Sequence, residues 1–307
     1  MHKSLTLTWQ QLVFLVSPDL LPMKLKDISS VVTFSRLNGI GRPLTYQKTI
    51  YDERDLKTLR TIFEWWVIIN KFAIPEYRNS ETTESLVKRV CTAILQSKKL
   101  AVYAVFCPSY KTGKGAYGYT GIIGNHTKKY IKKFCNFISE SKKAGLQIHA
   151  VAYFSDLLLE NFERLRGTNY KKDLKKNFKS FLEEFGKLQQ HGEIEVKKLS
   201  GISEAKSQIG EKGITQGELG IHERLFSRVY KRNIAFYHHE LGWTKGMVKK
   251  RTEILARSYS CLGQILKMKH PNGVMVFVES AYERGDMFSG DSNTDPIPII
   301  YPRKDRQ

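Results

Sequence analysis

The chain has 307 residues, of which 41% are hydrophobic and 11% aromatic, so it can bury a sizeable core and is not globally disordered. Its 50 Lys and Arg against 30 Asp and Glu give a net charge of +20, which favours polyanionic partners such as RNA, DNA or nucleotides. The four cysteines form no CxxC pair, and no apolar stretch reaches the roughly 20 residues of a membrane span. We therefore expect a cytoplasmic protein with no membrane partner.

The N-terminal part of the chain, residues 1–78, is predicted to be a helical appendage. Asp52–Phe72 carries apolar residues at helical spacing, and Pro75 ends this helix. Glu81–Lys98 is a second predicted helix with its own buried stripe. We expect residues 79–307 to form one α/β domain.

From residue 100 onward, apolar strands alternate with amphipathic helices. The predicted strands are Leu100–Cys107, Leu146–Phe154, Glu193–Leu199, Gly273–Glu279 and Ile297–Tyr301. The predicted helices are Asn125–Lys143, Leu157–Leu165, Tyr170–Leu188, Ile221–Glu240 and Thr244–Met268. Residues 200–218 are Gly-rich and polar and are predicted to be a surface excursion. This alternation predicts a Rossmann-like three-layer α/β fold with a mainly parallel central sheet of about five strands.

The loop after Leu100–Cys107 is the first candidate site, because open parallel sheets bind ligands beyond the carboxyl ends of their strands. It reads CPSYKTGKGAYGYTGIIGN, and Ser109 and Tyr110 come just after the buried strand. Ser109 could be a nucleophile or an anchoring hydroxyl. The alternative is a Pro-Ser turn that only ends the strand. The GxSxG elbow of α/β hydrolases is absent.

The same loop contains a formal GxGxxG match at Gly113, Gly115 and Gly118. A dinucleotide site would need the helix to begin at once, whereas here it begins only after Gly124. We therefore expect no NAD or FAD, and no other cofactor. The glycines instead predict a mobile cover that binds substrate. The histidines and cysteines are scattered, so we expect no metal site.

Other candidate residues follow the later strands. Asp156 ends the second predicted strand, and Tyr301 the last one, and both are assigned to substrate binding. Glu279 and Tyr282 follow the fourth strand and would converge on the first loop if the strands are parallel neighbours. The alternative for these polar residues is ordinary loop solvation.

Two predicted helices carry lysines on the face opposite their apolar stripe. These residues are Lys128, Lys129, Lys132 and Lys133 on the first helix, and Lys172, Lys175, Lys176 and Lys179 on the other. A solvated face is the commoner explanation of such charge runs. The alternative is contact with nucleic acid, which two basic helices beside one site would attract.

The order of these features resembles the tRNA-dependent cyclodipeptide synthases. The resemblance rests on Ser109 after LAVYAVFC, the basic helix YKKDLKKNFKSFLEEF, the strand EIEVKKLS, and Tyr301-Pro302. It covers roughly residues 100–302 and implies a fold like that of class I aminoacyl-tRNA synthetases. The isocyanide synthases, which act on amino acids, are a second family of similar layout, with N-terminal helices and two late strands.

The first resemblance implies a transferase that uses an aminoacyl-tRNA or a related activated amino acid. Ser109 would bind or accept the acyl group, Tyr110 and Tyr282 would orient it, and Glu279 would shuttle protons. The lysines of the two helices would hold the tRNA backbone. The alternatives are a non-catalytic nucleic-acid-binding protein and a small-molecule amino-acid-modifying enzyme of the isocyanide-synthase type.

Overall fold

The computed structural model describes residues 98–107, 123–166, 171–188, 194–209, 223–239, 242–278 and 299–300, together with individual helical residues between Thr61 and Ala93. The statements below concern these residues. Within them, no helix is long and apolar enough to cross a membrane.

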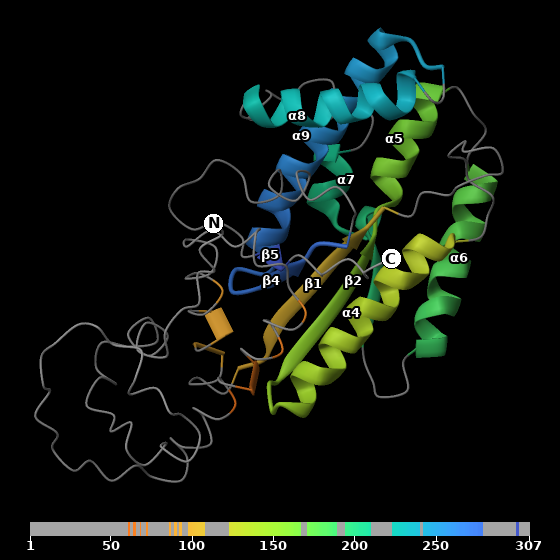
Figure 1. The fold of residues 1–307 in the computed structure, drawn as a ribbon. Coiled ribbons are helices and arrows are strands. Elements are labelled where there is room, and N and C mark those ends of the chain that lie inside the picture. Colours follow the sequence, from red (N-terminus) through yellow and green to blue (C-terminus); the bar gives the residue numbers. More distant parts are fainter. Residues whose placement is uncertain are drawn as a thin grey trace, which may run out of the picture.

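The centre of the molecule is a five-stranded, wholly parallel sheet in the order β3-β2-β1-β4-β5 (Figure 1). The strands are β1 (Leu100–Phe106), β2 (Ile148–Phe154), β3 (Ile194–Lys198), β4 (Val274–Val276) and β5 (Ile299–Ile300). Leu100 pairs with Ile148, and Val102 pairs with Val274. The α/β fold with a parallel sheet of five strands is therefore confirmed.

Helices cover both faces of this sheet, because strand residues are apolar on both sides. One face carries Phe106 and Phe154, whose rings contact Phe134 of α4 (Asn125–Lys143) and Phe181 of α6 (Lys171–Leu188). The buried residues Trp65, Leu86 and Val90, which precede the sheet in sequence, belong to the same core.

The opposite face carries the alternate strand residues, including Tyr103, Val151 and Tyr153. It packs on α5 (Asp156–Arg166), α7 (Ser203–Ile209) and α9 (Lys245–Lys269). Two shorter segments, the 3₁₀ turn η4 (Leu199–Gly201) and α8 (Glu223–Asn233), complete this side, and a π-helical turn η5 (Ile234–His238) follows α8. The hydroxyl of Thr244 caps α9 by accepting a 3.2 Å hydrogen bond from the amide of Met247.

One predicted element is wrong. The segment predicted as a surface excursion, residues 200–218, contains the helix α7, and Ala205 and Ile209 are fully buried. Ile202, Ala205 and Ile209 form an apolar stripe at helical spacing, and this stripe outweighs the polar composition of the segment.

The single helix predicted over Ile221–Glu240 is instead α8 followed by the π-helical turn. The strands β1, β2 and β4 are also shorter than predicted, by up to four residues at β4.

Candidate active site at the carboxyl edge of the sheet

All five strands end at the same edge of the sheet, here called the carboxyl edge, because they are parallel. Cys107 follows β1 there, Ser155 and Asp156 follow β2, and Ser200 follows β3. The amide of Ser155 donates a 2.9 Å hydrogen bond to the carbonyl of Phe106, so β1 and β2 stay paired to their ends. Cys107 is half-buried and packs against the cores on both faces of the sheet.

Asp156 is held by the chain that follows β3. One carboxylate oxygen accepts a 3.0 Å hydrogen bond from the amide of Ser200, and the other accepts one from the Ser200 hydroxyl. Asp156 is also the acidic residue in the first turn of α5, where it stabilises the helix dipole. Both carboxylate oxygens are therefore engaged in joining the ends of β2 and β3, and a substrate-binding role for Asp156 stays a prediction.

Ser155 is the unexplained polar group at this edge. Its side chain is fully buried, and its hydroxyl oxygen makes no hydrogen bond to any described residue. A buried hydroxyl without a partner costs free energy unless a ligand or water satisfies it. Ser155 is a donor at the carboxyl edge that the sequence did not single out, beyond its position after a buried strand.

The remaining predicted site residues lie outside the described part of the chain. They are Ser109, Tyr110, Gly113, Gly115, Gly118, Glu279, Tyr282 and Tyr301. The strands they follow, β1, β4 and β5, are hydrogen-bonded neighbours in the order β1-β4-β5. Their assigned roles stay predictions.

The two lysine-bearing helices, α4 and α6, pack on the same face of the sheet (Figure 1). The amide of Ile123, just before α4, donates a 3.2 Å hydrogen bond to the hydroxyl of Ser180 on α6. α4 follows β1, and α6 leads into β3, so both helices begin at the carboxyl edge and run toward the opposite edge. Their lysine-rich first halves therefore lie at the candidate site.

The charge on these helices is unevenly balanced. Residues 125–133 and 171–179 together contain nine lysines and one acidic residue, Asp173. Ion pairs occur nearer the far ends, where Lys143 lies 3.0 Å from Glu140, Lys179 3.9 Å from Glu183 and Lys187 3.6 Å from Glu184. Among the described side chains, no ion pair is formed by the lysines nearer the carboxyl edge, which are Lys128, Lys129, Lys132, Lys175 and Lys176. Lys133 lies 5.8 Å over the ring of Tyr130, and the side chain of Lys172 is outside the described residues.

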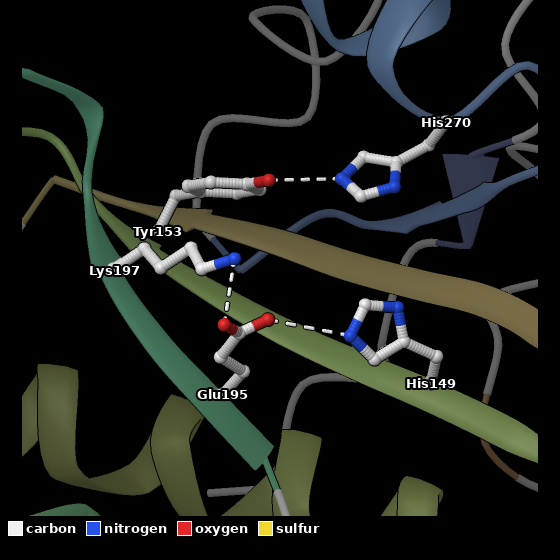
Figure 2. Close-up of polar contacts among 5 residues, drawn as sticks. All are labelled: His149, Tyr153, Glu195, Lys197 and His270. Carbon is white, nitrogen blue, oxygen red and sulfur yellow. Dashed lines mark hydrogen bonds and ion pairs between the residues drawn. The ribbon is translucent and has the colours of Figure 1, made fainter. Parts of the chain in front are cut away.

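A second polar group, which the sequence did not predict, lies on the α9 side of the sheet (Figure 2). The hydroxyl of Tyr153 and Nε2 of His270 share a buried 2.8 Å hydrogen bond. The ring of Tyr103 stacks on His270 at 5.0 Å. Burial lowers the pKa of His270 to about 4 and raises the pKa of Tyr153, so both side chains are neutral at pH 7. His270 ends α9 just before β4, whereas Tyr103 lies in the middle of β1 and Tyr153 is the last residue but one of β2.

An exposed ionic group extends from the same place along β2 and β3. Glu195 lies 2.6 Å from Lys197 and 3.3 Å from Nε2 of His149 (Figure 2). The hydrogen bond from Lys197 and, after it, that from His149 lower the pKa of Glu195. Sequence alone held one signal for this region: each of two largely apolar strands contains a tyrosine, Tyr103 and Tyr153. In the described part of the chain, no three His, Cys, Asp or Glu side chains come together as metal ligands.

No protein-family model and no curated protein matches this chain. The fold is similar to that of a solved structure, the PvcA protein from Pseudomonas aeruginosa, with a TM-score of 0.53 and 9% sequence identity. The match covers 73% of this chain and 81% of PvcA. At this identity the similarity is one of fold, and the chain shares with PvcA the α/β architecture that carries the candidate site.

Proposed function

We propose that the protein is a transferase-like enzyme that uses an aminoacyl-tRNA or a related activated amino acid, with its reaction site at the carboxyl edge. The observation that carries this proposal is the unbalanced lysine surface on the first halves of α4 and α6. Helix N-termini already carry partial positive charge, so lysines there are unfavourable for the isolated helices. A polyanion bound at this edge would compensate that cost.

The reaction follows from the predicted site residues. The Ser109 hydroxyl would attack the carbonyl of the aminoacyl ester, forming a seryl ester and breaking the bond to the tRNA ribose. The serine proton would pass to the departing ribose oxygen with Glu279 as the shuttle, while Tyr110 and Tyr282 orient the amino acid. The lysines of α4 and α6 would hold the tRNA backbone.

The test compares two sets of exposed lysines. Lys129, Lys175 and Lys176 are changed together to Gln. The matched control changes three exposed lysines near the amino ends of the strands: Lys98 and Lys99, which precede β1, and Lys269, which ends α9 before β4. Affinity for tRNA is measured across a salt series. The first variant should reduce the slope of log affinity against log salt by about 2 to 3, while the control should leave it unchanged.

Turnover is read separately, by mass spectrometry of products from charged tRNA. Ser109→Ala should abolish the product while tRNA affinity stays as in the wild type. Unchanged turnover in this variant contradicts the role of Ser109. Salt-dependent binding of tRNA without any product would support the alternative, a non-catalytic nucleic-acid-binding protein.

A second candidate is an enzyme that modifies a free amino acid, of the isocyanide-synthase type. Two observations favour it: late strands β4 and β5 are both part of the sheet, and the helical residues Trp65, Leu86 and Val90 pack on its core. Both features agree with the layout that the resemblance to isocyanide synthases implies. Product formed from free amino acids in the absence of tRNA supports this candidate over the first.

A further inference from the structure

A helical hairpin on the other face of the sheet carries a second cationic surface. It consists of α8, the π-helical turn η5 and the first turns of α9. The side-chain amide of Asn233 donates a 2.8 Å hydrogen bond to the hydroxyl of Thr252, and both side chains are buried between the helices. The hairpin is therefore a fixed element of the fold.

This hairpin lies toward the same edge of the sheet as the candidate active site. α9 has 25 residues, which corresponds to about 37 Å, and it ends immediately before β4. A seven-residue strand such as β1 spans only about 23 Å. Since α9 runs antiparallel to the strands, its first turns extend past their carboxyl ends, where Figure 1 shows α8 beside them at the top of the view.

Exposed cations dominate the hairpin. They are Arg228, Lys231, Arg232, Lys245, Lys249 and Lys250. Among the described side chains between Phe226 and Arg257, only Glu253 is acidic. The tRNA contact proposed for α4 and α6 does not involve these residues. The sequence of this region adds Glu223 and Glu240, so three acidic residues stand against these six cations, and the excess of positive charge attracts a polyanion.

Aromatic rings stand among these cations in a fixed arrangement. Tyr237 lies 5.0 Å from Phe236 and 5.0 Å from Trp243, and the guanidinium of Arg251 lies 4.1 Å over the ring of Tyr237. Backbone contacts set this geometry, because Nδ1 of His238 donates to the carbonyl of Trp243, and the amide of Trp243 donates to the carbonyl of Tyr237. The rings of Phe236, Tyr237 and Trp243 remain partly exposed. Phe236, Tyr237 and His238 lie in the π-helical turn, and such turns are frequent at functional sites.

We propose that this hairpin is a second nucleic-acid-binding surface, which takes a single-stranded RNA segment with its phosphates on Lys245, Lys249 and Lys250 and a base stacked on Trp243. Interleaved cations and rings are the combination that binds single strands without base-specific hydrogen bonds. A membrane surface would need exposed apolar side chains for insertion. The large exposed apolar residues of the described chain are Leu182 and Met268, and neither lies on the hairpin.

The inference rests on the proposed function in one respect: the tRNA held by α4 and α6 supplies the single-stranded segment. The two surfaces lie on helices that cover opposite faces of the sheet, and both face its carboxyl edge. A tRNA whose backbone lies along α4 and α6 can therefore extend an unpaired end across that edge to the hairpin. In this arrangement the hairpin binds the unpaired end of the tRNA, and α4 and α6 bind its backbone.

The experiment measures binding of a fluorescently labelled, unstructured adenosine RNA of about 12 nucleotides across a salt series. Changing Lys245, Lys249 and Lys250 together to Gln should reduce the salt slope by about 2. The control variant, with Gln at Lys98, Lys99 and Lys269, should bind as the wild type does. An equal loss in both variants, or no loss in either, overturns the proposal.

Stacking is tested at Trp243 with two variants. Trp243→Leu should weaken RNA binding about tenfold or more, and Trp243→Phe should retain most of the affinity because it keeps a ring. Both leave the backbone bonds of Trp243 in place, and their melting temperatures check folding. Equal affinity of Trp243→Leu and wild type overturns the stacking role. Loss of binding to vesicles with anionic lipid, with RNA binding unaffected, would make the surface a membrane contact and overturn the proposal.

The variant of Lys129, Lys175 and Lys176 is measured on the same RNA and on tRNA to separate the two proposals. If only that variant loses affinity on both, the hairpin inference fails and the proposed function stands. If only the hairpin variant loses affinity on both, the inference stands, and the tRNA contact proposed for α4 and α6 fails.

Discussion

The hydroxyl of Tyr153 and Nε2 of His270 share a 2.8 Å hydrogen bond that joins β2 to the end of α9 across 117 residues of sequence. His270 also stacks on Tyr103 of β1, and the guanidinium of Arg89 binds the carbonyls of Pro271 and Gly273 at 2.9 and 2.8 Å. One buried cluster therefore fixes the end of α9 and the start of β4 against the sheet. Because α9 also carries the cationic hairpin, this cluster sets where that surface lies.

Replacing Tyr153 with Phe should destabilise the fold by about 1 to 3 kcal/mol, because the buried ring nitrogen of His270 loses its partner. The free energy of unfolding from urea titration measures the effect. Tyr230→Phe is the matched control, since Tyr230 is partly exposed and its ring stacks on Phe226. A control variant as unstable as Tyr153→Phe would show that the lost stability does not come from the His270 contact.

His270 should make the stability depend on pH between about 6.5 and 4. Its pKa is lowered to about 4 in the folded protein, first by burial and then by the charges of His149, Lys269 and Lys197, against Glu195. The unfolded chain therefore binds the proton more readily, and stability falls as the pH drops through this window. A shift of that size corresponds to about 3 kcal/mol at most.

The measurement is the free energy of unfolding at pH 7, 6, 5 and 4 for wild type and His270→Gln. The variant is less stable throughout, but the decline of its stability across the window should be shallower, because the variant lacks the His270 imidazole while the other groups are the same in both proteins. Parallel curves for the two proteins would contradict the role of His270.

Most helices and strands of this fold could be predicted from the periodicity of the sequence, whereas the elements that each of them packs against could not. Asn125–Lys143 matches α4 at both ends, since its apolar stripe and its Gly145 stop are local signals. The helix α7 was missed because its polar composition conceals the two apolar residues, Ala205 and Ile209, that face the core. Strand ends were overextended because apolar runs continue past the paired residues, as in the buried Val278 after β4.

Contacts between distant segments depend on strand order, which no local pattern supplies. The sequence placed Asp156 at a strand end, but its bonds to Ser200 exist only because β2 and β3 are neighbours. The same holds for Tyr153 and His270, which lie on the sheet and on the helix that covers it. The lysine faces of α4 and α6 were predicted, whereas their packing side by side required the fold.

Cys135 should resist alkylation in the native protein. Its side chain is buried on α4, and burial raises the pKa of its thiol to about 12, so almost no reactive thiolate is present at pH 8. Mass spectrometry after a short iodoacetamide treatment should find Cys135 unmodified in the native protein and modified in urea. Rapid native modification of Cys135, with no change in the circular dichroism spectrum, would contradict the packing of α4.

Gly273 lies where no side chain fits. A Cβ atom there would lie 2.8 Å from Cε1 of Tyr103 and 2.8 Å from Cβ of His270, both held in the buried cluster. Gly273→Ala should therefore lower the free energy of unfolding by about 1 to 3 kcal/mol, because the rings must shift. Gly186 on the exposed face of α6 has open space around it and is the matched control. Gly186→Ala should raise stability by up to about 1 kcal/mol, since alanine favours the helix. Thermal unfolding of both variants distinguishes the two effects, and a Gly273→Ala protein as stable as wild type would contradict the tight packing at the start of β4.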